Sequence, residues 1–442
     1  MTVAVAPPDP QPAHRVARAG LIFLVASVAI QGLNVVSGVV LARALGPAGR
    51  GELAAVLLWP SVLASVGDLS ASAAVAYFTA SGASAIRAMS ATAFVVSVVQ
   101  ALALVVIGYV IMPLLLGHYG AHAVFAGRLY LGAWLPLNLA AAAGMAILQG
   151  RLEWAALNLA RLVVAAAIVA GLMILVYAHH VSVLGATWVY IAATSLGFAI
   201  IIAVLVARRW VGLHPDMRLT RSIMTFGLKT HGGSLAGQAN LNMDKMAVAT
   251  FLPQSDLGLY SVAVTLSAPL TLIGSSIGIV ALPAVAASAS ASEMRHQLAW
   301  FCRSALLLST VTTLALVVLT PVLIRAFFGA AFAPATVIAQ LCIIAAMARA
   351  LGSVLAHGLS AFNKPLVPSA AEGIAVLVTI AGLAVLLPRM GLVGAAITSL
   401  MAYGASTACM VWFLTCRLEI ALPELIWPRR TDIGPWARCL RR

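Results

Sequence analysis

The sequence predicts an all-α polytopic membrane protein with about 12 transmembrane helices in two six-helix bundles. Composition, an internal repeat and the spacing of apolar segments support this fold class. Hydrophobic residues make up 62% of the 442 residues and charged residues 9%, and the mean hydropathy is +1.05. Soluble domains are about 45–50% apolar and about 25% charged. A chain with this composition is expected to place most of its surface against lipid.

The two halves of the chain resemble each other. Residues 20–58 and 227–265 align without a gap at an offset of 207. The matched positions include polar residues as well as Gly and Leu, namely Gly20, Ser27, Gln31 and Gly51 with Gly227, Ser234, Gln238 and Gly258. Further along, Gly185 and Gly394 match at an offset of 209. Duplicated halves in a membrane protein are typical of transporters.

Twelve segments are long and apolar enough to cross a bilayer, which takes about 20 residues per helix. In the first half they are 19–43, 53–79, 89–116, 129–149, 155–177 and 181–207. In the second half they are 223–251, 257–286, 299–327, 332–360, 366–388 and 391–416. Six spans per half give both halves the same orientation, so the sequence predicts a pseudo-twofold axis along the membrane normal.

The polar stretches divide the chain further and predict its orientation. We expect a cytoplasmic N-terminal arm (1–18), a first bundle (19–207), a cytoplasmic connection (208–222), a second bundle (223–416) and a cytoplasmic basic tail (417–442). With this arrangement 19 of the 26 Lys and Arg residues lie inside, as the positive-inside rule requires. Arg349 falls within the bilayer, and the outer side holds Arg43, Arg50, Arg128, Lys245, Arg325 and Arg389. The expected location is the inner or plasma membrane, with the first helix retained rather than cleaved as a signal peptide.

Several function classes are disfavoured. The net charge of +14 is spread over short loops and the tail, whereas a nucleic-acid binder gathers its basic residues on one soluble face. The five cysteines show no CxxC spacing, and the chain contains no Walker loop. We therefore expect no metal, no cofactor, no nucleic-acid partner and no enzymatic activity.

Two spans carry polar stripes. In 223–251 the stripe is spaced 3, 4, 4 and 3 residues, which keeps it on one helix face; it comprises His231, Ser234, Gln238, Asn242 and Lys245. In 19–43, Ser27, Gln31 and Asn34 repeat the pattern. Amides of this kind also join helices in membrane bundles. Matching stripes in the two halves favour the lining of a shared central cavity.

Ionisable residues inside spans are costly and are therefore candidates for function. The carboxylates are Asp68, Asp244 and Glu372, and the cations are Lys245, Arg349, Arg161 and Arg303. Arg161 and Arg303 lie near predicted helix ends, where a long side chain can reach the membrane surface. Hydrogen bonding between helices is the alternative role for Asp68, Glu372 and Arg349.

Three stretches carry a family resemblance. ARALGPAGRGELAAV (42–56), NMDKMAVATFLPQSDLGLYSVAV (242–264) and GLVGAAITSL (391–400) are similar to the corresponding segments of bacterial polysaccharide-unit flippases. These proteins form a branch of the multidrug/oligosaccharidyl-lipid/polysaccharide exporter superfamily. The similarity runs over essentially the whole chain, although its motifs consist mostly of Gly, Leu and Ala.

The resemblance implies transport of an undecaprenyl-diphosphate-linked oligosaccharide from the inner to the outer leaflet by alternating access, for polysaccharide biosynthesis. Twelve spans fit this branch, because the lipid II branch typically has fourteen. The implied partners are the lipid-linked oligosaccharide and membrane lipids, with a polysaccharide polymerase and glycosyltransferases as further candidates. A cation-coupled multidrug exporter and a non-transporting scaffold for glycan assembly remain alternatives. Many bacterial drug antiporters carry a carboxylate in the first helix, and residues 20–42 contain none.

Such a substrate needs cations for its diphosphate and amides or hydroxyls for its sugars. We expect the cations to be Lys245 and Arg349, supported by Arg161 and Arg303, and the sugar ligands to be Gln31, Asn34, Ser234, Gln238 and Asn242. Asp68, with Asp244 and Glu372 behind it, is expected to respond to a proton or cation.

Overall fold

The computed structural model describes residues 13–82 and 84–427, with side chains from Val25 onward except at 233 and 234, and this part of the chain is helical without strands. The first half contains α1 (Ala13–Gly67), α2 (Ala71–Ala80), α3 (Ile86–Leu116), α4 (Ala121–Gly150), α5 (Trp154–Tyr177) and α6 (Val183–Ala207). The second half contains α7 (Met217–Phe251), α8 (Gln254–Ala286), α9 (Ala291–Leu323), α10 (Ala335–Ala361), α11 (Leu366–Arg417) and α12 (Leu422–Ile426). Short helices η1 (Gly117–Tyr119), η2 (Ile324–Phe328) and η3 (Ala330–Phe332) lie between the longer ones.

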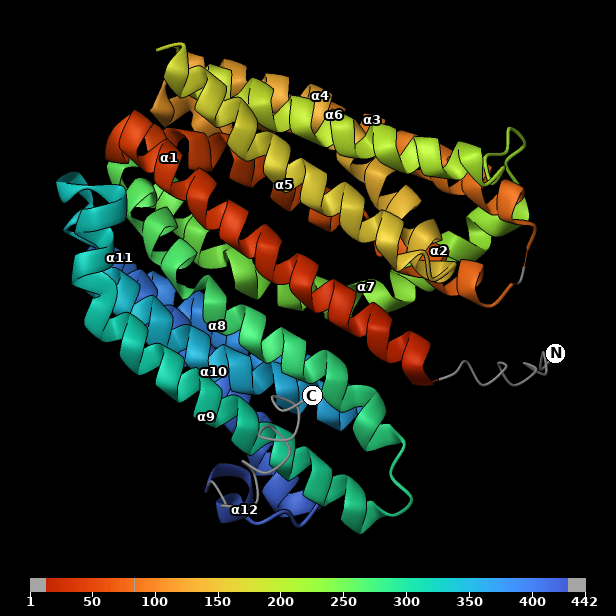
Figure 1. Ribbon diagram of the computed structural model, residues 1–442. Helices are drawn as coiled ribbons and strands as arrows, with labels where there is room; N and C mark the ends of the chain where they lie inside the picture. The colour runs from red at the N-terminus through yellow and green to blue at the C-terminus, as the bar shows by residue number, and fades with distance from the viewer. Residues whose placement is uncertain (1–12, 83, 428–442) are drawn as a thin grey trace.

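Two of the helices each supply two membrane spans. The 55 residues of α1 would be about 82 Å long if straight, against about 30 Å for the hydrocarbon layer. The chain instead turns back at Gly46, whose φ of 67° is a conformation that glycine adopts without steric cost (Figure 1). The 52-residue α11 turns in the same way at Gly391, with φ 56°.

The predicted number of spans follows from these turns. Within the described residues, nine helices are long and apolar enough to cross a membrane. Counting α1 and α11 twice raises this number to eleven. Helix α7, whose 35 residues are long enough but which is the most polar of the long helices, completes the twelve. The all-α, two-bundle fold class is confirmed.

The second span differs from the prediction of one continuous helix over 53–79. The structure divides it at residues 68–70, between the end of α1 and the start of α2, where Leu69 and Ser70 have φ values of 49° and 55°. Asp68 stabilises the break, since its Oδ1 accepts a hydrogen bond from the Ser72 hydroxyl at 2.7 Å. Its backbone carbonyl accepts another from Gln100 Nε2 at 3.1 Å.

Some helices also extend beyond the predicted apolar segments. Helices α4 and α9 begin at Ala121 and Ala291, eight residues before the predicted starts at 129 and 299. For α9 the reason is a polar N-cap: Ser290 Oγ accepts a hydrogen bond from the Glu293 amide, and Glu293 Oε2 accepts one from Ala289 N. This capping arrangement supports helix in residues too polar for the membrane core.

The two halves form separate bundles that meet along α1 and α8 (Figure 1). Gly51 and Gly258, which are matched positions of the repeat, lie against each other at this boundary. A Cβ on Gly51 would lie 1.6 Å from the carbonyl oxygen of Gln254, and one on Gly258 would lie 2.0 Å from that of Pro47. Equivalent residues that face each other mark a twofold relation, so this contact lies at the pseudo-twofold axis.

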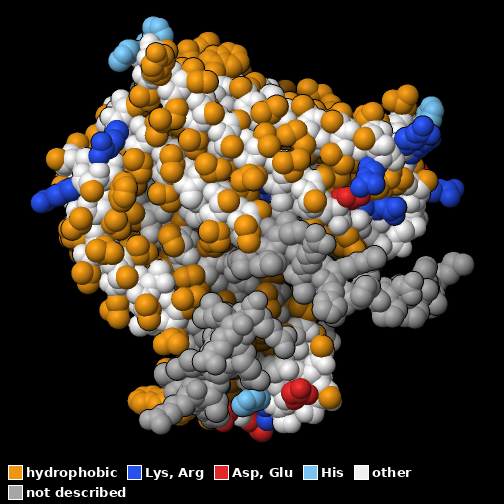
Figure 2. Space-filling view, in the orientation of Figure 1, with side chains coloured by type: hydrophobic (Ala, Val, Ile, Leu, Met, Phe, Trp, Pro, Cys, Tyr) orange, Lys and Arg blue, Asp and Glu red, His pale blue; other side chains and the backbone are white. Residues whose placement is uncertain are grey.

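The surface has the pattern of a membrane protein. Hydrophobic side chains cover the middle of the face in Figure 2, and Lys and Arg side chains gather towards its ends. We define the inner end as the end that carries the 208–216 connection, predicted to face the cytoplasm, and the outer end as the opposite one.

Candidate functional site

Helix α7 connects the two bundles. At its inner end Ile223 is buried in the core of the first bundle, and the Phe226 ring stacks on Tyr77 of α2 with 4.9 Å between the ring centroids. Gly227 packs directly on the helix break, because a Cβ there would lie 2.5 Å from the Leu69 carbonyl oxygen. The outer half of α7 packs on α8 and α11 of the second bundle.

The outer half of α7 contributes to a polar group that we call the C-half cluster. It comprises half-buried Glu372 and the buried residues Asn240, Asp244, Tyr260, Thr379 and Ser399. At its centre the Asp244 side chain is only 6% exposed. Its Oδ2 accepts hydrogen bonds from Tyr260 Oη at 2.6 Å and Ser399 Oγ at 3.2 Å, and its Oδ1 accepts one from the Lys245 amide at 2.7 Å. The carboxylate is therefore satisfied by neutral donors of α7, α8 and α11.

The second carboxylate of the C-half cluster lies on the first part of α11. Glu372 Oε2 accepts a hydrogen bond from Asn240 Nδ2 at 2.9 Å, and Asn240 Oδ1 accepts one from the Thr379 hydroxyl at 3.1 Å. Asn240 and Asp244 are four residues apart, on one face of α7. One face of α7 thus carries Asp244 and, through Asn240, holds Glu372 of α11 in a neighbouring hydrogen-bonded group.

Arg349 lies beside the C-half cluster. Its guanidinium carbon is 5.1 Å from the centroid of the Tyr403 ring. Tyr403 lies one turn after Ser399 on α11, so it shares a helix face with the residue that donates to Asp244. The structure thus brings a proposed substrate cation and two proposed coupling carboxylates into one region of the second bundle.

The first bundle contains a cavity of about 250 Å³ between α1, α4, α5 and α6, and most of its lining is apolar. Its lining includes Asn34, Asn138, Arg161 and Thr194. Two residues singled out from the sequence, Asn34 and Arg161, are therefore neighbours here. The cavity offers one cation with amide and hydroxyl groups around it.

The remaining predicted site residues are dispersed. Asn242 Nδ2 donates to the backbone carbonyl of Gln238, one turn earlier in α7, at 3.1 Å, while Gln238 is exposed and Gln31 half-buried. The Ser234 side chain lies outside the described residues. Arg303 is buried and donates to the backbone carbonyl of Glu424, before the end of α12, at 2.5 Å. Asp68 lies at the helix break described above.

Several polar residues of the C-half cluster were not among the predicted site residues. Thr379 and Ser399 come from α11, far from Asp244 in sequence, and Tyr260 comes from the next helix, 16 positions away. None of the three belongs to a polar pattern of its own. Asn240 could have been found, since its spacing of four from Asp244 places the two on one helix face. The stripe chosen from the sequence follows a neighbouring face of α7.

At the outer end the bundles are joined by hydrogen bonds to backbone carbonyls. Arg43 of α1 donates from Nε to the Phe327 carbonyl at 2.6 Å, and from a terminal nitrogen to the Ala326 carbonyl. The Tyr119 hydroxyl donates to the Ala249 carbonyl at 3.0 Å. With the Gly51–Gly258 contact, these bonds close the outer end of the boundary between the bundles.

The comparisons with known proteins agree with this architecture. A sequence profile for a family described as polysaccharide biosynthesis protein matches residues 40–337, more than half of the chain. The chain belongs to this family. No curated protein sequence matches the chain.

Solved structures show that this family member has the fold of MOP superfamily transporters. The lipid II flippase MurJ in an inward closed conformation superimposes with a TM-score of 0.75, 16% identity, and coverage of 95% of this chain and 96% of that one. An inward-facing multidrug resistance MATE family transporter of the MOP superfamily gives 0.69 and 15% identity, covering 88% and 94%. A MOP superfamily transporter from Pyrococcus furiosus gives 0.61 and 15% identity, covering 91% and 95%.

Proposed function

We propose that the protein moves a lipid-linked oligosaccharide with a diphosphate headgroup from the inner to the outer leaflet by alternating access, for polysaccharide biosynthesis. Membership in the polysaccharide biosynthesis protein family supports this proposal. The main structural support is the placement of polar groups in both bundles. Arg349 lies in the second bundle, half-buried Lys245 lies on the outer half of α7, and the cavity with Asn34 and Arg161 lies in the first bundle.

This placement suits the chemistry of the substrate. A diphosphate that enters a low-dielectric region needs cations, and Lys245 and Arg349 supply them. Sugar hydroxyls need donors and acceptors, which Gln31, Asn34 and the amides of α7 supply. The lipid tail stays in the bilayer while the headgroup passes between the bundles, so no covalent step is required.

The test compares variants of Lys245 in proteoliposomes loaded with a lipid-linked oligosaccharide whose sugar is accessible to an added glycosidase only after translocation. A fixed cation attracts the headgroup mainly by its charge, so Lys245→Arg should keep much of the rate and Lys245→Gln should lose most of it. Lys364→Gln, at an exposed inner-end lysine, serves as a matched control. Equal rates for wild type and both Lys245 variants would contradict the assigned role, and an inactive wild type would contradict the function itself.

We further propose that Asp68, Asp244 and Glu372 respond to a proton or cation that drives transport. The neutral donors around Asp244 and Glu372 support this assignment, because they can hold either a charged or a neutralised carboxyl group. The same observation favours the second candidate function, cation-coupled export of drugs. Deleting the gene should then sensitise cells to cationic dyes without altering surface glycan, and the opposite outcome would favour the flippase.

The proposed setting is the inner or plasma membrane, with both termini in the cytoplasm and glycosyltransferases and a polysaccharide polymerase as partners. Single cysteines near Gly120 or Arg389, in a cysteine-free background, should react with an impermeant thiol reagent added outside. A cysteine at Asp216 should not. The reverse labelling pattern would overturn the orientation.

A further inference from the structure

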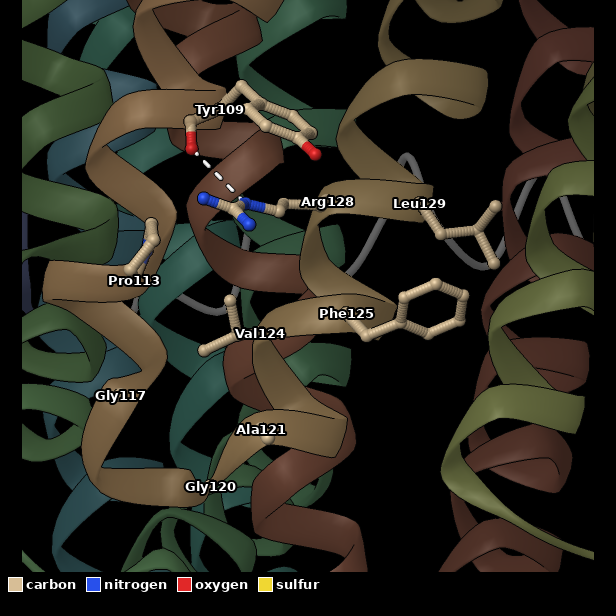
Figure 3. A pocket seen from close by; sticks show the side chains of 9 residues that line it. All are labelled: Tyr109, Pro113, Gly117, Gly120, Ala121, Val124, Phe125, Arg128 and Leu129. Carbon is tan, nitrogen blue, oxygen red and sulfur yellow. Dashed lines mark hydrogen bonds between the residues drawn. The ribbon is translucent and has the colours of Figure 1, made fainter.

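The hairpin formed by α3, η1 and α4 holds a groove that plays no part in the proposed transport path. The groove lies towards the outer end of the first bundle and has a volume of about 630 Å³. Small residues, Gly117, Gly120 and Ala121, form the turn of the hairpin, and Arg128 lies farther along α4 (Figure 3). Arg128 is the one charged residue in the lining.

A proline fixes the position of this arginine. Pro113, inside α3, has no amide hydrogen, so the carbonyl of Tyr109 four residues earlier loses its helical partner. Arg128 Nε donates to that carbonyl at 3.3 Å, and the guanidinium carbon lies 4.1 Å from the centroid of the Tyr109 ring (Figure 3). Tyr109 thus contacts the guanidinium group through both its backbone carbonyl and its ring. Its terminal nitrogens carry further hydrogen-bond donors for a ligand.

The depth of Arg128 matches the polar boundary of a bilayer. The 30 residues of α4 span about 45 Å, which exceeds the hydrocarbon thickness of about 30 Å by about 15 Å. If the helix is centred, the hydrocarbon begins about 7.5 Å from its outer start. Arg128 lies seven residues, or about 10 Å, from that start. Its guanidinium is therefore within reach of lipid phosphate groups.

The surface beside the groove faces lipid rather than the second bundle. Leu114 is 82% exposed, Val110 73% and Phe125 60%. In a membrane-spanning hairpin, side chains with this exposure contact acyl chains. The occupant of the groove should therefore combine a phosphate with hydrocarbon chains. An acidic residue that could pair with a cationic lipid headgroup is absent from the lining.

We propose that this groove binds the phosphate of an anionic phospholipid, with Arg128 as the cation that recognises it. Tyr109 orients the guanidinium, and the exposed apolar residues of α3 and α4 receive the acyl chains. The proposal does not depend on the transported substrate. A protein that fails to move a lipid-linked oligosaccharide would still carry this site.

The test is native mass spectrometry of the delipidated full-length protein titrated with dimyristoyl-phosphatidylglycerol or dimyristoyl-phosphatidylcholine. The wild type should bind the anionic lipid more tightly. Arg128→Gln should weaken that binding about tenfold, because it removes one charged hydrogen-bond donor, and should leave binding of the zwitterionic lipid nearly unchanged. Gln keeps an amide donor for the Tyr109 carbonyl, and an unchanged melting temperature would show that the hairpin remains intact.

Two further variants and one further lipid make the result decisive. Arg128→Lys, which keeps the charge, should keep most of the affinity for phosphatidylglycerol. Arg389→Gln, a matched control at an exposed outer-end arginine of α11, should bind like the wild type. Equal binding of phosphatidylglycerol by the wild type and Arg128→Gln would overturn the site. Tighter Arg128-dependent binding of undecaprenyl diphosphate than of phosphatidylglycerol would overturn the phospholipid assignment and identify the groove as a substrate site.

Discussion

Helices α1 and α7 are equivalent in the repeat, yet they differ in charge where each packs into the protein. At the offset of 207, Asp244 aligns with Ser37 and Lys245 with Gly38. Ser37 donates to a carbonyl of its own helix at 2.9 Å, whereas Asp244 binds groups from two other helices. The duplication thus conserves the path of the chain while concentrating buried charge in the second half.

The second spans of the two halves differ in continuity. In the first half the span is divided at residues 68–70, against the inner end of α7. In the second half the equivalent α8 runs without interruption from Gln254 to Ala286. There Gly274 allows close packing on α10, since a Cβ would lie 2.4 Å from Ala350 Cα. The first bundle therefore accommodates α7 through a break, whereas the second holds its own helices by close packing.

The largest expected difference between the halves concerns Asp244 and its counterpart Ser37. Asp244→Leu removes the acceptor of the Tyr260 and Ser399 hydroxyls and of a backbone amide, so it should lower the free energy of unfolding by about 3–5 kcal/mol. Ser37→Ala should cost about 1 kcal/mol or less. Denaturation of the purified variants in detergent measures both values. Similar losses would show that the two halves do not differ in this respect.

The next effect tests the contact at the pseudo-twofold axis. Gly51→Ala and Gly258→Ala each place a Cβ too close to a backbone carbonyl, so each should cost about 1–3 kcal/mol and should separate the outer ends of the bundles. Spin labels on cysteines at Ala44 and Ala331, which are exposed, should report a longer distance in both variants. Gly32→Ala, where a Cβ would meet open space, is the control. Opposite behaviour of the two variants would argue against a symmetric contact.

The smallest effect on stability is expected at Asp68, although the effect on transport should be large. Asparagine keeps a carbonyl oxygen that can accept the hydrogen bond from the Ser72 hydroxyl, so Asp68→Asn should change the free energy of unfolding by about 0.5 kcal/mol or less. If the carboxylate couples transport by changing its protonation, Asp68→Glu should transport better than Asp68→Asn. Transport measured across pH distinguishes the two. Normal transport by Asp68→Asn at every pH would leave Asp68 with a structural role at the helix break alone.

The sequence predicts the spans and the repeat well because both depend on local composition. A run of about 20 apolar residues is sufficient to define a span, and Gly51 and Gly258 preserve the repeat. The helix break at Leu69 and Ser70 could not be predicted in this way. Their backbone conformations are rare outside glycine. The residue that packs on them, Gly227, lies 158 positions after Leu69 in the sequence.

The candidate site shows the same division between local and distant information. Stripe residues are recognisable by helical spacing and Asp244 by its charge within a span, but the partners of Asp244 are not recognisable, since Ser399 lies 155 positions away. The pairing of Asn240 with Glu372 likewise depends on how α11 packs against α7. Charge alone therefore identified Asp244, Glu372 and Arg349 as candidates, and packing brought them together.

The turns at Gly46 and Gly391 limit what the outer end offers to the surroundings. Each reverses the chain with a single residue of non-helical backbone conformation. Neither turn therefore offers an extended segment that a protease could cleave or an antibody could bind. An affinity tag inserted at either turn would have to disturb two helices at once. The 208–216 connection at the inner end is the longer target, so reagents that recognise an extended peptide should reach this protein from that side.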